Sequence, residues 1–167
     1  MSKTEEGLKT AFAGESQANR KYIAFAEKAD KDGFPQIAKI FRAAAAAETI
    51  HALNHLKVLG GVKSTKENLQ AAVEGEHYEF TKMYPEFINS AKEEGNEDAE
   101  RTFNYANKAE KIHHKLYTVA LEAVDSGKDL NKEDVYVCPV CGYTHEGTPP
   151  EKCPICNTAK KLFRKID

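Results

Sequence analysis

The chain has 167 residues, 41% hydrophobic and 30% charged, which suffices for one medium domain or for one medium and one very small domain. Its longest apolar run, residues 43–47, is far shorter than the about 18 to 20 residues of a membrane span. The start of the chain shows no secretion signal, so we expect a cytoplasmic protein without a membrane segment. The 24 basic and 26 acidic residues are interspersed, which argues against a nucleic-acid partner.

Residues 3 to about 123 are rich in the helix formers Ala, Glu, Lys and Leu, and apolar residues recur every three or four positions. Pro85 predicts a kink within one helix, because proline removes a hydrogen bond of the helix. Four long helices with short connections predict an all-α four-helix bundle of the ferritin-like type, with a polar linker, over residues 1–134. The helices are expected over about residues 4–31, 35–59, 64–94 and 98–124.

All four cysteines fall in the last thirty residues, together with four of the six prolines. The pairs Cys138/Cys141 and Cys153/Cys156 can place four thiolates around one tetrahedral metal ion. Disulfides are a weaker alternative, because the remainder of the chain is free of cysteine and carries no secretion signal. The spacing leaves zinc and iron open, since both accept four sulfurs. We predict a second, metal-stabilised domain over residues 135–167.

A second group of candidate metal ligands lies on the apolar faces of the predicted helices. It contains two Glu-x-x-His motifs, whose members share a helix face, and further glutamates from the other two helices. This is the ligand set of a carboxylate-bridged pair of metal ions in a helix bundle. Buried unpaired carboxylates cost several kcal/mol, which metal ions would offset; iron or manganese suits these ligands, and zinc stays open. The candidates are Glu15, Glu48, His51, Glu76, Glu79, Glu110 and His113.

An internal repeat supports this interpretation. TAFAGE, which ends at Glu15, is similar to AAVEGE, which ends at Glu76, and ETIH is similar to EKIH. Each half therefore contributes one lone Glu and one Glu-x-x-His. Glu79 breaks the symmetry, because Ala18 stands in its place in the first half.

A third Glu-x-x-His motif, Glu74 with His77, lies on another side of its helix. Glu74 is about 160° round the helix from Glu76, so we interpret Glu74 and His77 as solvated. The remaining histidines are expected to be surface or ordinary structural residues; they are His55, His114 and His145.

The cysteine segment VCPVCGYTHEGTPPEKCPICNTAKKLF resembles rubredoxin. The combination of this segment with the helical region resembles the rubrerythrin family, through AGESQANRKY, EGEHYEFTKMYPEF and the two Glu-x-x-His segments. The resemblance implies two irons in the bundle and one iron on the four cysteines, with zinc substitution possible. It implies reduction of hydrogen peroxide by an NADH peroxidase type of enzyme in oxidative-stress defence. Electrons would come from an NAD(P)H-dependent reductase or through rubredoxin, and the chain would form a homodimer.

The same resemblance implies roles for single residues. Glu48 and Glu110 would bridge the irons, Glu15 would bind one iron, and Glu76 and His113 would bind the other.

It also implies a ligand exchange at one iron, with Glu79 bound in the oxidised state and His51 in the reduced state. Tyr22 and Tyr84 would hydrogen-bond ligand carboxylates, whereas ordinary packing is the alternative for both. Two other functions stay open: a ferritin-like protein that oxidises or stores iron, and an electron carrier whose bundle is only structural.

Overall fold

The computed structural model describes residues 2–167 and divides into two compact units, with the boundary between Lys63 and Ser64. Among the described residues, no helix has the length and apolar character needed to span a membrane. The first unit contains α1 (Lys3–Lys31) and α2 (Pro35–Val58). The second contains α3 (Thr65–Tyr78), the π-helix η1 (Glu79–Met83), α4 (Tyr84–Glu93), α5 (Glu97–Asp125), β1 (Val135–Val137), β2 (Thr144–Glu146), the 3-10 helix η2 (Lys160–Leu162) and β3 (Arg164–Ile166).

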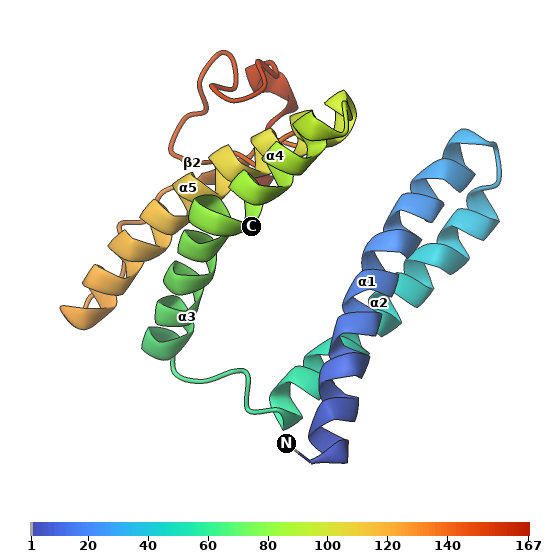
Figure 1. Ribbon diagram of the computed structural model, residues 1–167, viewed down its shortest axis with the longest axis horizontal. Helices are drawn as coiled ribbons and strands as arrows, with labels where there is room; N and C mark the ends of the chain where they lie inside the picture. Colours follow the sequence, from blue (N-terminus) through green and yellow to red (C-terminus); the bar gives the residue numbers. More distant parts are fainter. Residues whose placement is uncertain (1) are drawn as a thin grey trace. The chain divides into compact units, whose positions relative to one another are not determined.

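The first unit is a hairpin of two long helices that lie side by side (Figure 1). Ser2 caps α1 by accepting a hydrogen bond from the backbone N–H of Glu5, and Pro35 begins α2, where a missing N–H costs nothing. Small buried side chains allow the two helices to approach closely, because alanine occupies little volume between them. These residues are Ala26, Ala29, Ala38, Ala45 and Ala52.

Asn19 is the one buried polar side chain of the described residues, with 6% of its surface exposed. Its Nδ2 donates to the backbone oxygen of Ala45 (2.6 Å) and to Oγ1 of Thr49 (2.7 Å) on α2. Its Oδ1 accepts a hydrogen bond from Nε of Arg20 (2.8 Å). A buried amide is stable only when it is hydrogen-bonded, and here the bonds fix the register of α1 on α2.

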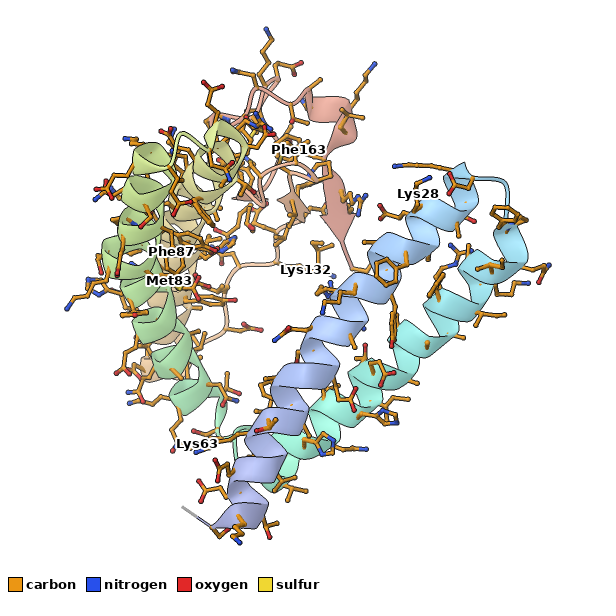
Figure 2. The ribbon with its side chains drawn as sticks, turned by 45° about the vertical axis from the view of Figure 1, so that its right-hand side comes forward. Lys28, Lys63, Met83, Phe87, Lys132 and Phe163 are labelled. Carbon is orange, nitrogen blue, oxygen red and sulfur yellow. The ribbon has the colours of Figure 1, made fainter. Side chains whose placement is uncertain are left out.

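In the second unit, α3, η1 and α4 follow one another along α5 (Figure 1). Ser64 and Glu67 form a capping box, in which the side chain of each residue is bonded to the backbone N–H of the other. The predicted kink at Pro85 takes the form of a π-helix just before it. Figure 2 labels Met83, the last residue of η1, and Phe87 of α4.

The N–H of Tyr84 donates to the oxygen of Glu79, five residues earlier. Pro85 has no N–H to donate, so the regular α-helical ladder cannot continue through this point. The ladder shifts by one residue instead, which is the defining feature of a π-helix.

The cysteine segment folds as a three-stranded antiparallel sheet, in the order β2-β1-β3, with Tyr136 opposite both His145 and Lys165. Its core consists of cysteine side chains, against which Tyr143 and Phe163 pack, together with Tyr105 of α5. The predicted fold class, long helices followed by a small cysteine domain, is confirmed. The domain boundary at residue 134 stays a prediction.

Candidate metal centres

The four cysteines converge on one point in the second unit, where their sulfur atoms all lie within 4.8 Å of one another. Two sulfur pairs are 3.5 Å apart, Cys138 with Cys156 and Cys141 with Cys153. Four sulfurs bound tetrahedrally at about 2.3 Å would be about 3.8 Å from one another, whereas a disulfide requires about 2.05 Å. The four cysteines therefore form no disulfide. Their sulfur–sulfur distances fit four ligands of a single metal ion.

Both Cys-x-x-Cys pairs sit in the same kind of turn. The N–H of Gly142 donates to the oxygen of Cys138 (3.0 Å), and the N–H of Asn157 donates to the oxygen of Cys153 (2.9 Å). Gly142 and Asn157 have φ values of +78° and +62°, the left-handed region that glycine and asparagine tolerate best.

Backbone N–H groups in these turns point at sulfur. Burial opposes ionisation of Cys138, but hydrogen bonds from the N–H groups of Val140 and Cys141, together with those to the Thr158 and Cys156 side chains, outweigh it and lower the pKa of this thiol to about 7. Because the thiolate is the form that binds a metal, the turn prepares Cys138 as a ligand.

In the first unit, donor atoms of Glu15, Glu48 and His51 lie within 4.8 Å of one another. Nδ1 of His51 is 2.8 Å from Oε2 of Glu48. The Glu48 side chain is 18% exposed and that of His51 is 52% exposed, so solvent reaches the group mainly at His51. This cluster joins three of the predicted ligands.

In the second unit, donor atoms of Glu76, Glu110 and His113 also lie within 4.8 Å of one another. Nδ1 of His113 is 2.6 Å from Oε2 of Glu110 and 3.9 Å from Oε1 of Glu76. The three side chains are only 17 to 25% exposed. Oε2 of Glu76 is buried and has no hydrogen-bond partner among the described residues, which a metal cation would supply.

The charges in this cluster are strongly coupled. Burial, together with the neighbouring Glu110 carboxylate, raises the pKa of Glu76 from 4.5 to about 7. The hydrogen bond from His113 lowers the pKa of Glu110, and the same bond raises the pKa of His113. Without a metal, these two nearby carboxylates are therefore compensated by protons on His113 and Glu76, and a divalent cation would take the place of those protons.

Glu79 and Tyr84 adjoin this cluster at the two ends of η1. Burial and the charge of Glu110 raise the pKa of Glu79. Burial, followed by the charges of Glu110, Glu79 and Glu76, raises the pKa of Tyr84. The ring of Tyr84 also packs against Phe87 and Phe103.

Tyr22 lies in an aromatic cluster with Phe25 and Phe41, at ring-centroid distances of 6.3 and 6.2 Å. This arrangement agrees with the packing alternative, and the predicted bond from Tyr22 to a carboxylate stays a prediction.

A link between the carboxylate cluster and the cysteine domain was missed by sequence reasoning. Nε2 of His113 lies 3.2 Å from the oxygen of Gly142 and 3.0 Å from Oγ1 of Thr144. Gly142 directly follows Cys141, one of the predicted metal ligands. The spacing of about thirty residues carries no local pattern, so no signal in a single sequence announces this contact.

Both the helical part and the cysteine part of the chain match models of known protein families. Residues 6–121 match the family model described as rubrerythrin, and residues 136–164 match that of the rubrerythrin rubredoxin-like domain. The chain is 39% identical to rubrerythrin-2 of Clostridium acetobutylicum, over 96% of this chain and 95% of the relative. It is 40% identical to rubrerythrin of Nitratidesulfovibrio vulgaris, over 99% of this chain and 95% of the relative.

A solved structure of nigerythrin in its fully reduced, all-ferrous state is also similar. It has a TM-score of 0.59 and 38% identity, and the match covers 99% of this chain and 88% of that chain. Members of the family are di-iron proteins of oxidative-stress defence that work with redox partners. With its Glu and His clusters and its four-cysteine rubredoxin-like site, the chain belongs to the rubrerythrin family.

Proposed function

We propose that the protein is a peroxidase that reduces hydrogen peroxide to two waters, with two protons and two electrons. The observation that carries this proposal is the contact of His113 with Gly142 and Thr144, because it joins the carboxylate cluster to the cysteine domain. When bound, the iron ions supply the redox chemistry: two electrons at the di-iron centre and one electron at a time at the cysteine site.

The proposed ligands of the third iron are the four cysteines. The proposed ligands of the di-iron centre are Glu15, Glu48, His51, Glu76, Glu79, Glu110 and His113. In the metal-free protein, His113 holds a proton against Glu110. When the Nε2–H group donates a hydrogen bond to the oxygen of Gly142, the proton stays on Nε2. The other nitrogen, Nδ1, is then free to bind a metal. Gly142 and Thr144 therefore select the tautomer and the ring orientation of His113.

Four further residues have proposed roles at the di-iron centre. Glu79 and His51 are proposed to exchange as ligands of one iron. Tyr22 and Tyr84 are proposed to orient ligand carboxylates.

The four-cysteine site would supply electrons to the di-iron centre. This favours peroxide reduction over iron storage, because storage requires that electrons be removed from iron. We further propose an NAD(P)H-dependent reductase, with or without rubredoxin, as the electron source.

We also propose that the chain forms a homodimer. The first unit leaves several large apolar side chains 47% or more exposed, such as Phe25, Ile37 and Ile50, and exposed apolar surface of this kind favours association.

Rapid mixing of the anaerobically reduced, iron-loaded protein with peroxide or with oxygen tests the proposal. We expect faster oxidation by peroxide, with two electrons delivered per peroxide. Faster oxidation by oxygen, or assembly into a mineral-filled shell of many subunits, would exclude it.

A pair of variants tests the role of the helical ligands. Glu48→Gln and Glu110→Gln should abolish peroxide turnover, whereas Glu74→Gln, an exposed residue of α3, should retain it. Full activity in the first two variants would show instead that the helices are only structural and that the cysteine site alone is redox-active.

A further inference from the structure

Two histidines that belong to none of the three candidate metal clusters lie next to each other in the second unit. The ring centroids of His77 on α3 and His114 on α5 are 5.6 Å apart, with an angle of 47° between the ring planes. The sequence places both among solvated or ordinary structural residues. In the structure His77 is exposed and His114 is half-buried, so the pair is open to solvent on one side.

The spacing of the two rings suits a shared metal ion. Two imidazoles bound to one tetrahedral ion at about 2.0 to 2.1 Å have ring centroids about 5 Å apart. The observed separation of 5.6 Å is only slightly larger, and a small rotation of the exposed His77 toward His114 closes the difference. Because the rings come from different helices, α3 and α5 would both be held by the ion.

A carboxylate is available to complete the site. Glu74 precedes His77 by three residues on the exposed surface of α3, and residues with this spacing are neighbours on a helix. The same spacing in this chain brings Glu48 within 2.8 Å of His51, and Glu110 within 2.6 Å of His113. A rotation of Glu74 can therefore bring its carboxylate to an ion held by His77.

Phe80 forms the apolar side of this site. Its ring lies edge-on to both imidazoles, with centroids 5.4 Å from each. This apolar ring limits the orientations of the two imidazoles and keeps water away from one side of the site. Apolar side chains around metal sites commonly have this role. The alternative is that His77, Phe80 and His114 form an aromatic cluster that only packs.

We propose that His77, His114 and Glu74 form a further binding site for a divalent transition-metal ion of the zinc type. Imidazole and carboxylate ligands suit Zn²⁺, Cu²⁺ and Ni²⁺, and water would complete the coordination. The site is separate from the carboxylate cluster, because Glu74 and His77 lie on another side of α3 from Glu76.

Calorimetric titration of the oxidised, iron-loaded protein with Zn²⁺ tests the proposal, with the iron content measured before and after. We expect one additional Zn²⁺ per chain. His77→Gln and His114→Gln should each weaken this binding by about tenfold or more, because even the loss of a group that only supports a metal ligand commonly costs about 10- to 100-fold in affinity. His55→Gln, which removes a histidine of α2, is the matched control and should leave the affinity unchanged.

Pulsed electron paramagnetic resonance with Cu²⁺ as the probe counts the bound imidazoles independently of affinity. Two are expected in the unchanged protein and one in either histidine variant. Absence of additional Zn²⁺ binding, or equal Zn²⁺ affinity in His77→Gln and His55→Gln, would overturn the proposal and leave the cluster as packing alone. Unchanged affinity in Glu74→Gln would overturn the part assigned to the carboxylate.

Discussion

Nε2 of His113 lies 3.0 Å from Oγ1 of Thr144, so a side chain of the carboxylate cluster contacts the strand that follows the first cysteine pair. The other nitrogen of the same ring faces Glu110. One imidazole therefore has the two candidate metal centres of the second unit on its two sides, and this contact is where their coupling can be tested.

Thr144→Val removes the hydroxyl partner of His113 and keeps the volume of the side chain. We expect slower oxidation of the cysteine-bound iron after mixing with peroxide, by about tenfold or less, because the oxygen of Gly142 still accepts a bond. Stopped-flow absorbance of the cysteine site measures this rate. Thr148→Val, in the exposed turn of the same domain, is the control; equal rates in both variants would show that the hydroxyl does not matter.

The metal-free protein should lose stability as the pH rises from 5 to 8. The folded pKa of Glu76 is raised to about 7, above the unfolded value of 4.5. Its stabilising contribution is therefore complete below pH 4.5 and is lost as the pH passes through 7, by at most about 3 kcal/mol. The raised pKa of His113 acts in the same direction above pH 6.5.

Thermal unfolding of the metal-free protein across this pH range checks the sign. Glu76→Gln should flatten the curve, since the amide does not titrate, whereas the exposed Glu74→Gln should leave the slope as it is. A melting temperature that rises with pH would contradict the assignment.

Gly142→Ala should destabilise the protein by about 1 to 2 kcal/mol, because a side chain in the left-handed region carries that cost. Space is not the reason: a Cβ at this position would be 3.9 Å from that of Ala109, an ordinary contact. Gly7→Ala is the opposite case. Gly7 lies in the exposed first part of α1, and a Cβ added there would have no atom within 4 Å. It should stabilise the helix by up to about 1 kcal/mol. Chemical unfolding measures both, and equal effects would rule out the backbone explanation.

Asn19→Ala should destabilise the α1–α2 hairpin by about 1 to 3 kcal/mol, because the two hydrogen bonds to α2 and the one from Arg20 are lost. The exposed Gln17→Ala on the same helix should change stability by less than about 0.5 kcal/mol. Thermal unfolding of the two variants side by side is the measurement. A neutral Asn19→Ala would mean that apolar contacts alone hold the helices in register.

Features that depend on neighbours in the sequence could be predicted without a structure. The capping box at Ser64 and Glu67 involves residues three positions apart, as do the two Glu-x-x-His motifs. The turn after each cysteine pair is equally local. In all these cases the spacing along the chain fixes the distance in space, because helices and tight turns have a regular geometry.

The π-helix at Glu79–Met83 could be predicted only in part. Pro85 indicates that the helical ladder is interrupted, but a kink, a break and a π-turn all satisfy that condition. The packing of η1 and α4 against α5 decides among them, and packing depends on residues that are distant in the sequence.

By itself the sequence determined the kinds of candidate ligand and their local grouping: four cysteines in two turns, and glutamates and histidines at helical spacing. Only the tertiary structure decided which groups meet across elements, namely His113 with Thr144 and His77 with His114. The physical reason is that such contacts join residues 31 to 37 positions apart, whose distance is set by how whole helices and strands pack and by no local geometry.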